Sequence, residues 1–171
     1  MNAVDFAREL IDIDSTTGRE QEAGECLARS LRSLGYRVDE QPVRNGRQNI
    51  VATIDSPVVV LSTHYDCVPP HFPSSIRDGR LYGRGSCDAK GILAAQVAAI
   101  ERLRQAGETR VGMLFVVGEE RGSDGANVAN ASPIGSQFLV NGEPTDSRLA
   151  IATRGNLRLR LRATSGCDQP L

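Results

Sequence analysis

The chain of 171 residues lacks tryptophan, has few other aromatic residues and contains no long apolar run. No segment approaches the roughly 20 apolar residues that a membrane-spanning helix needs, so we expect no membrane partner. The formal net charge of −1 gives no bulk attraction to nucleic acid. Residues 1–13 contain early acidic residues and no basic segment, which argues against a secretory signal and favours a cytoplasmic protein.

Cysteine pairs with the spacing of redox or zinc motifs are also missing. The four cysteines, at positions 26, 67, 87 and 167, form no CxxC motif and suggest no disulfide framework. A cytosolic chain keeps such thiols reduced. Free cysteine behaves as a small hydrophobic residue, so we expect Cys67 and Cys87 to be small buried side chains.

A buried strand followed by polar residues is the central feature of the sequence. Residues 58–61 are apolar and mostly β-branched, and His64 and Asp66 follow them closely. A glycine-rich turn then brings Asp88 to the start of a helix. In open α/β sheets, ligands bind at the carboxyl ends of the strands. One imidazole and two carboxylates are therefore expected where such folds perform chemistry.

Two further apolar segments end in acidic residues. Residues 111–117 precede Glu119 and Glu120, and residues 138–141 precede Glu143. Mixed histidine and carboxylate ligands suit zinc and other first-row divalent ions. Taken alone, Glu119 and Glu120 would be interpreted as an exposed acidic pair on a loop. Their position after an apolar strand instead favours a place in a metal site.

Strand and helix patterns alternate along the chain. Helical spacing of apolar residues extends over residues 2–13, over 23–34 and from Asp88 to about Gln105. Strands are expected near residues 36–43, 48–54 and 58–63, with a turn at Asn45-Gly46 between the first two. This alternation predicts an α/β fold of three layers, a sheet with helices on both faces.

Several polar residues have simple structural interpretations. Ser15, Thr16 and Thr17 precede a helix and are interpreted as N-terminal caps. His71 lies in the proline-rich segment 68–79, which is expected to be a loop, and is interpreted as a surface histidine rather than a metal ligand. The alternating leucines and arginines of residues 157–162 predict a strand whose basic face is solvated, and not a nucleic-acid site.

The glycine-rich turn before Asp88 also suggests a phosphate-binding loop. That alternative fails on two details. A phosphate loop requires GxxxxGK followed by serine or threonine, whereas here Lys90 precedes Gly91. Asp88 would also place a negative charge beside the phosphate.

Four short motifs occur in a specific order: HYD at 64–66, GRGSCDAKG at 83–91, GEE at 118–120 and NGEP at 141–144. Together they resemble the co-catalytic zinc amidohydrolases, a family that includes acetylornithine deacetylase, succinyl-diaminopimelate desuccinylase, aminoacylase and carboxypeptidase G. The resemblance covers roughly residues 1–163. Residues 64–92 are most similar to the acetylornithine deacetylase-like branch, so the expected fold is a zinc-peptidase-like sheet.

The resemblance implies two divalent ions, zinc by preference and otherwise cobalt or manganese, which share the carboxylate of Asp88. His64 and Glu143 would complete the first site, and Glu120 would bind the second ion. The implied substrate is an N-acylated amino acid or a small peptide, whose amide bond is cleaved by an activated water.

The same resemblance assigns catalytic roles to Asp66 and Glu119. Asp66 would hold the second imidazole nitrogen of His64 and fix its tautomer. Glu119 would act as the general base, which takes a proton from water and returns it to the leaving amine.

The sequence departs from this family in its length and its histidines. Family members are more than twice as long, with an inserted domain for dimerisation and substrate closure, and they have late histidines that this chain lacks, since it contains only His64 and His71. We expect residues 1–153 to form the N-terminal part of the catalytic domain and 154–171 the truncated start of the inserted domain, without the family's dimer surface. A truncation or frameshift near Cys167 would account for the ending.

These departures leave an alternative. The chain would then be a truncated, non-catalytic fragment that binds at most one metal ion. Its sheet would have an open edge, and we therefore expect poor solubility or marginal stability.

Overall fold

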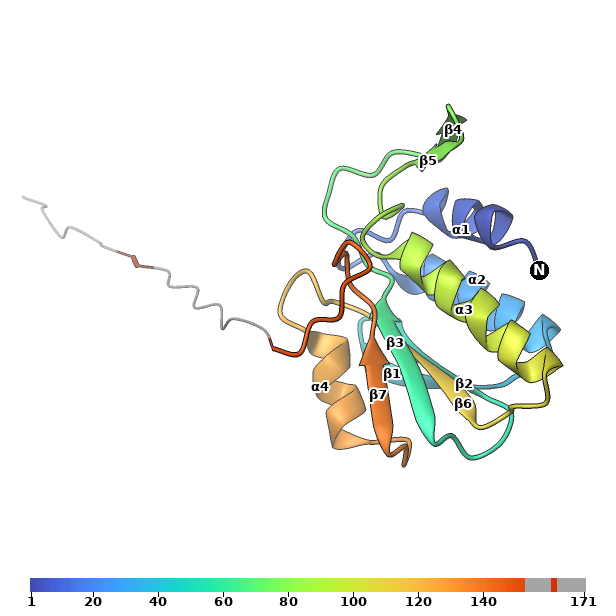
Figure 1. Cartoon of the computed structure of the whole chain (residues 1–171). Helices are drawn as coiled ribbons and strands as arrows, with labels where there is room; N and C mark the ends of the chain where they lie inside the picture. Colours follow the sequence, from blue (N-terminus) through green and yellow to red (C-terminus); the bar gives the residue numbers. More distant parts are fainter. Residues whose placement is uncertain (153–160, 163–171) are drawn as a thin grey trace, which may run out of the picture.

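The computed structural model describes residues 1–152 and 161–162 (Figure 1). In this part of the chain, the elements follow in the order α1 (Ala3–Ile11), α2 (Gln21–Ser33), β1 (Arg37–Arg44), β2 (Arg47–Thr53), β3 (Val59–His64), β4 (Ser75–Arg77), β5 (Arg80–Tyr82), α3 (Lys90–Gln105), β6 (Val111–Val116), α4 (Asp124–Ala131) and β7 (Phe138–Asn141). None of the described helices combines the length and apolar character that crossing a bilayer requires.

The main sheet has the strand order β1-β2-β6-β3-β7. β1 pairs with β2 and β2 with β6 in antiparallel fashion, whereas β3 runs parallel to both β6 and β7. The register places His64 beside Val116 and Ser62 beside Asn141. Because these three strands are parallel, their carboxyl ends share one edge of the sheet, as the sequence predicted.

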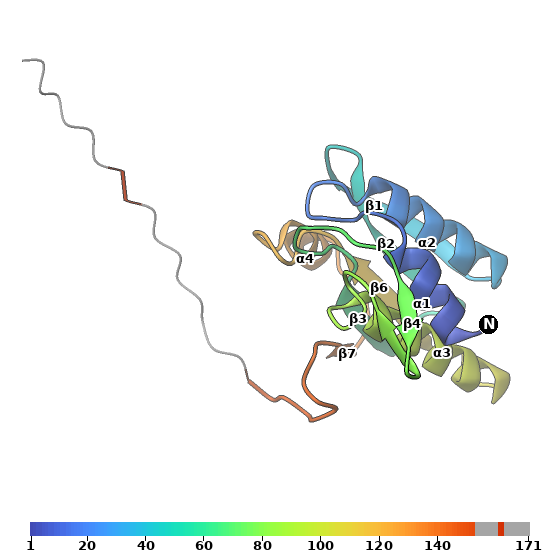
Figure 2. The ribbon, with the colours of Figure 1, turned by 90° about the horizontal axis from the view of Figure 1, so that it is seen from above.

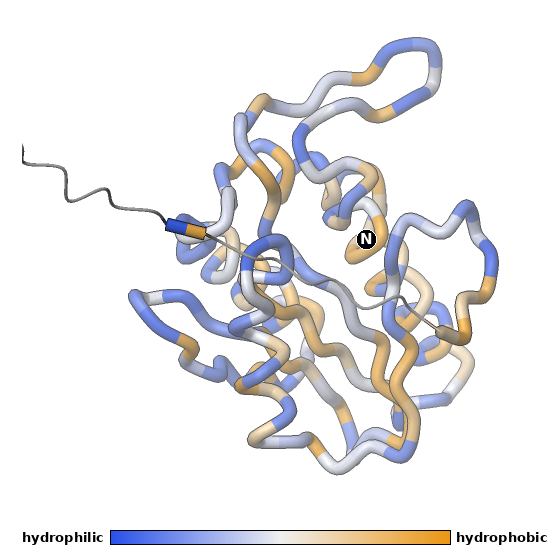
Figure 3. The backbone as a smooth tube through the Cα atoms, turned by 90° about the vertical axis from the view of Figure 1, so that its left-hand side faces the viewer, coloured by the Kyte–Doolittle hydropathy of each residue, from blue (hydrophilic) through white to orange (hydrophobic). Residues whose placement is uncertain are grey.

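Helices cover both faces of this sheet, which confirms the predicted three-layer α/β fold. α1, α2 and α3 lie on one face and α4 lies on the other (Figures 1 and 2). The larger core lies on the three-helix side and includes Leu27, Leu93 and Phe115. A smaller cluster, with Val60 and Leu114 at its centre, packs beneath α4. Figure 3 shows apolar residues concentrated along the central strands.

Local sequence explains how several elements begin and end. Asn45 and Gly46 have φ values of 54° and 74°, so this dipeptide forms the tight turn that joins β1 to β2. Gly35 follows α2 with a φ of 92°, a conformation that favours glycine just after a helix. The Asn45-Gly46 turn agrees with the sequence analysis.

Two interpretations of the loops were wrong. The segment 68–79 is not entirely a loop, because its end forms the β4–β5 hairpin with Asp78 and Gly79 at the turn. Ser15, Thr16 and Thr17 do not cap α2. That helix begins at Gln21, its N-cap residue is Glu20, and the Glu20 side chain makes no capping hydrogen bond to the first turn.

The three cysteines within the described residues divide into two groups. Cys26 and Cys67 are buried, which confirms the expectation for Cys67. Cys87 is exposed, contrary to expectation, because it lines a cavity between α3 and the segment that follows β7. The strand predicted over 157–162 and the segment 154–171 fall almost entirely outside the described residues and stay predictions.

Candidate metal centre

His64 ends β3 with its ring held in a fixed orientation. The side chain is 1% exposed. Its Nδ1 lies 3.0 Å from the backbone oxygen of Asp66 and 3.4 Å from Oδ1 of the same residue. Its Nε2 lies 2.8 Å from Asp88 Oδ1. The ring therefore directs Nε2 at the carboxylates of the site, while Asp66 holds the opposite nitrogen.

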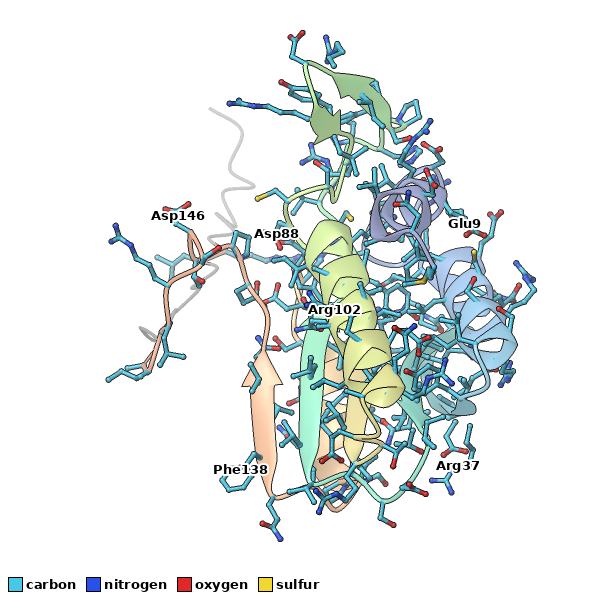
Figure 4. All side chains as sticks on the ribbon, turned by 45° about the vertical axis from the view of Figure 1, so that its right-hand side comes forward. Glu9, Arg37, Asp88, Arg102, Phe138 and Asp146 are labelled. Atoms are coloured by element: carbon cyan, nitrogen blue, oxygen red, sulfur yellow. The ribbon has the colours of Figure 1, made fainter. Side chains whose placement is uncertain are left out.

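Asp88 and Glu143 converge on His64 from two other elements. Asp88 lies just before α3, after the glycine-rich turn, and the peptide bond that follows it is cis. Figure 4 shows Asp88 beside the first turn of α3. Glu143 follows β7, and its Oε2 lies 3.9 Å from His64 Nε2. Ligand atoms of all three residues lie within 4.8 Å of one another.

Asp66 is a fully buried carboxylate that accepts several hydrogen bonds. Thr17 Oγ1 donates to Oδ2 at 2.8 Å, and the backbone amides of Glu119 and Glu120 donate at 3.0 and 3.3 Å. Burial alone would raise the pKa of Asp66, but the hydrogen bonds from His64, Thr17 and Glu119 outweigh it and lower the pKa. Asp66 therefore stays ionised and links His64 to the loop that contains both glutamates.

Glu119 and Glu120 lie on either side of this arrangement. The exposed Glu119 lines a cavity of about 300 Å³ together with His64 and Glu143. Glu120 is partly buried but lies outside the group of three ligand residues. Burial and the charge of Asp88 raise the pKa of Glu120. Of the four predicted ligands, the structure thus brings His64, Asp88 and Glu143 together and leaves Glu120 adjacent.

The charges of the site fit a divalent cation. Burial alone would lower the pKa of His64, but the carboxylates of Asp66 and Asp88 raise it to about 9. Burial raises the pKa of Glu143, and nearby carboxylates add to the rise. Within the described residues, no lysine or arginine pairs with Asp88, Glu120 or Glu143. The group thus offers one imidazole nitrogen and several carboxylate oxygens, a set of ligands that suits a divalent metal ion. No lysine or arginine side chain among the described residues balances their charge.

Two residues near the centre, Thr17 and Arg47, are not indicated by any sequence motif. Thr17 donates a hydrogen bond to Asp66 rather than capping the N-terminus of α2. Arg47, 5% exposed, donates to Glu20 Oε1 at 3.1 Å and to Asp124 Oδ2 at 2.9 Å. It also packs against Gly118, where a methyl group would lie 3.1 Å from its Nη1. No motif marks Arg47, because a hairpin arginine is usually solvated.

His71 takes no part in the centre. It is half-buried in its loop, and its Nε2 lies 3.1 Å from the backbone oxygen of Ile11. His71 thus lies in a loop, as expected, although it is less exposed than a surface histidine, and it is not among the three residues of the candidate centre.

Comparison with known proteins identifies the family. The family described as Peptidase family M20/M25/M40 matches residues 60–155, a segment that contains every residue of the centre. The chain belongs to the M20 peptidase family. The members of this family are described as peptidases, a class of hydrolases.

Curated M20 relatives match almost the whole chain. A probable carboxypeptidase of Aspergillus terreus is 39% identical over 181 residues, which cover 93% of this chain and 42% of the relative. A Peptidase M20 domain-containing protein of Schizosaccharomyces pombe is 36% identical over 172 residues, or 95% of this chain and 43% of the relative. The chain therefore spans less than half the length of these relatives.

Solved M20-like structures share the fold. A tripeptidase from Staphylococcus aureus superposes with a TM-score of 0.70 at 27% identity, over 81% of this chain and 42% of that one. Aminopeptidase PepT from Bacillus cereus has the same TM-score at 26% identity, over 82% and 42% of the two chains. An M20 family metallo-carboxypeptidase from Sulfolobus solfataricus, at 20% identity and a TM-score of 0.65 over 82% and 38%, supports the fold alone.

Proposed function

We propose that this chain carries the metal centre of a hydrolase that cleaves the amide bond of a small peptide or an N-acylated amino acid. The convergence of His64, Asp88 and Glu143 within 4.8 Å carries the proposal. The names of the relatives, which include probable carboxypeptidases, a tripeptidase and an aminopeptidase, support a peptide substrate. The acetylornithine deacetylase-like branch, which would favour an N-acetyl amino acid, stays a narrower prediction.

In this proposal, His64, Asp88 and Glu143 hold the first ion, and Asp88 and Glu120 contribute to a second. Zinc suits these ligands, and cobalt or manganese would also be accepted. A divalent ion in such a site supplies Lewis acidity, which acidifies water and polarises the carbonyl group of the substrate.

Glu119 is the proposed general base. Its carboxylate is exposed on the cavity that His64 and Glu143 also line, so it is accessible to water and substrate. Glu119 would hold the proton taken from water and pass it to the nitrogen of the leaving amine. Asp66 would keep His64 in place through contacts with its Nδ1.

A second candidate function is binding of a single ion without turnover. One observation favours it: Glu120 lies outside the group of three ligand residues. In either case we propose that residues 1–153 form part of a catalytic domain and that a further domain begins near residue 154.

Metal content and hydrolysis together test the proposal. Zinc per chain is measured by mass spectrometry after dialysis, and release of amino acids is measured with N-acetyl amino acids and dipeptides. We expect bound zinc in the wild type, its loss in His64→Gln and its retention in His71→Gln, the matched control. Hydrolysis together with two ions supports the enzyme, and one ion without hydrolysis supports the second candidate. Equal zinc content in both variants would refute the metal centre.

A further inference from the structure

The segment Ser15–Thr17 is joined to the residues that follow β3. Thr17 N donates to the Cys67 oxygen at 3.0 Å, and Cys67 N donates to the Ser15 oxygen at 3.0 Å, as in a short parallel bridge. The Ser15 hydroxyl donates to the Tyr65 oxygen at 2.6 Å. The backbone of Thr17 is therefore fixed beside Asp66 before any side-chain contact is considered.

The side chain of Thr17 completes the contacts of the Asp66 carboxylate. Oδ1 accepts from Glu119 N at 3.0 Å and lies 3.4 Å from His64 Nδ1. Oδ2 accepts from Thr17 Oγ1 at 2.8 Å and from Glu120 N at 3.3 Å. Among the described residues, Thr17 is the only hydroxyl donor to Asp66, and it makes the shortest of these bonds. It also comes from outside the segments that contain the candidate ligands and base.

We propose that Thr17 is a positioning residue that acts through Asp66 on both His64 and the Glu119–Glu120 backbone. Without the hydroxyl, Oδ2 keeps only the longer bond from Glu120, so the carboxylate rotates more easily about its Cβ–Cγ bond. Such rotation weakens the contacts of Oδ1 with the Glu119 amide and with His64 Nδ1, which then keeps only the backbone oxygen of Asp66 at 3.0 Å. One hydroxyl thus fixes a candidate metal ligand and the candidate base together, which deepens the proposed function and rests on it.

The chain offers two matched controls. Thr17→Val removes the hydroxyl and keeps the shape, whereas Thr17→Ser keeps the hydroxyl. Thr16→Val makes the same chemical change one residue earlier, where the side-chain hydroxyl interacts with Asp14 and makes no hydrogen bond to Asp66. A general effect of placing valine in this segment would therefore appear in both valine variants.

Two measurements on the 171-residue chain test this role. Cobalt(II) titration, followed by visible absorption, reports affinity and ligand geometry, and hydrogen exchange in the metal-free chain reports the Glu119 and Glu120 amides. We expect Thr17→Val to weaken cobalt binding by about 10- to 100-fold and to change the spectrum. The exchange of both amides should accelerate, while Thr17→Ser and Thr16→Val behave as wild type.

Wild-type affinity and unchanged amide exchange in Thr17→Val would overturn the proposal. If Thr17→Val fails to fold, the cobalt affinity of Thr17→Ser tests the proposal instead. This variant keeps the hydroxyl, so a tenfold loss of its cobalt affinity would also overturn the positioning role of Thr17. If the wild-type chain binds no cobalt, the proposed function fails. The amide exchange of the metal-free variants then still decides the role of Thr17.

Discussion

Neighbouring glutamates in this chain occupy distinct environments. Glu119 is exposed on the cavity and Glu120 is partly buried near Asp88, although the two follow the same strand. Their amides both donate to Asp66, which fixes the backbone from which the two side chains diverge. Because the two side chains diverge, Glu119 can serve as the proposed general base while Glu120 serves as the proposed ligand of the second ion.

Glu119→Gln tests that division. A general base typically contributes about 10²- to 10⁴-fold to the rate, so we expect kcat to fall by that factor while zinc affinity changes less than about threefold. Glu120→Gln should instead lower the zinc content. Steady-state kinetics and calorimetric zinc titration measure the two effects. A parallel loss of rate and zinc binding in Glu119→Gln would contradict the assignment.

Glu101 provides a prediction about pH that does not involve the metal centre. Arg104 donates two hydrogen bonds to Glu101, at 2.9 and 2.7 Å, and lowers its pKa below the ordinary value of 4.5 against the effect of burial. The buried hydroxyl of Tyr36 also donates to Glu101. A carboxylate with a lowered folded-state pKa stabilises the fold above pH 4.5, and this contribution is lost as the pH falls through the folded-state pKa.

Glu101→Gln should therefore reduce the free energy of unfolding at pH 7 by about 1–2 kcal/mol, because hydrogen bonds to a charged group are weakened. The difference from wild type should shrink as the pH falls below 4.5. Urea denaturation at several pH values measures it. A difference that does not depend on pH would show that the ionised carboxylate contributes nothing.

At the scale of elements, α4 approaches the sheet closely because of a glycine. A methyl group at Gly125 would collide with the Asn49 side chain and would lie 2.5 Å from the Val117 carbonyl oxygen. Asn49 also donates to the Gly125 oxygen at 2.8 Å. The first turn of α4 is thus held against the end of β6, next to the loop that contains the glutamates.

Gly125→Ala is expected to lower the free energy of unfolding by about 1–3 kcal/mol, the usual effect of overpacking, despite the higher helix propensity of alanine. Asn127→Ala, at an exposed position of the same helix, should change it by less than about 0.5 kcal/mol. Chemical denaturation distinguishes the two variants. Equal stability of both would mean that α4 can move outward without loss.

Sequence patterns predicted the elements whose contacts are local or periodic. The apolar runs of β3 and β6 favour buried strands, and the Asn45-Gly46 pair favours a tight turn. The sequence therefore predicted where these elements lie along the chain. The β4–β5 hairpin was missed, although Asp78-Gly79 is a recognised turn pair, because proline dominated the interpretation of that segment. The link between Thr17 and Asp66 spans 49 residues and accompanies the backbone bridge between Thr16 and Cys67, which no local sequence pattern predicts.

The order of the motifs along the chain was sufficient to select the candidate ligands. It did not show which of their side chains lie close together in space. His64, Asp88 and Glu143 follow different elements, and only the parallel register of β3 and β7 with the start of α3 brings them together. Glu120 differs because its position depends on the path of a loop. The exposure of Cys87 likewise follows from a cavity between elements that are distant in sequence.

At the scale of the whole molecule, β7 forms one edge of the described sheet. Its side chains are exposed, at 61% for Phe138, 56% for Leu139 and 52% for Val140. Figure 4 shows Phe138 projecting away from the sheet near the start of β7. We therefore predict that this exposed apolar edge strand promotes self-association, and the poor solubility expected from the sequence stays a prediction.

Phe138→Lys should reduce self-association, because a charge on an edge strand opposes strand pairing. Val4→Lys, a similar change at an exposed position on α1, should not. Sedimentation velocity over a range of protein concentrations measures both. Unchanged association in Phe138→Lys would show that this edge is not the surface involved.

The three converging side chains of the metal centre have a thermodynamic consequence. His64 and Asp88 are 24 residues apart, and Glu143 follows roughly 55 residues later, so an unfolded chain must close two long loops to chelate an ion. An ion at this centre would therefore bind the folded chain selectively and would link segments between residues 64 and 143. Zinc at about 100 times its dissociation constant would add about 2.7 kcal/mol to the free energy of unfolding, and a chelator would remove it.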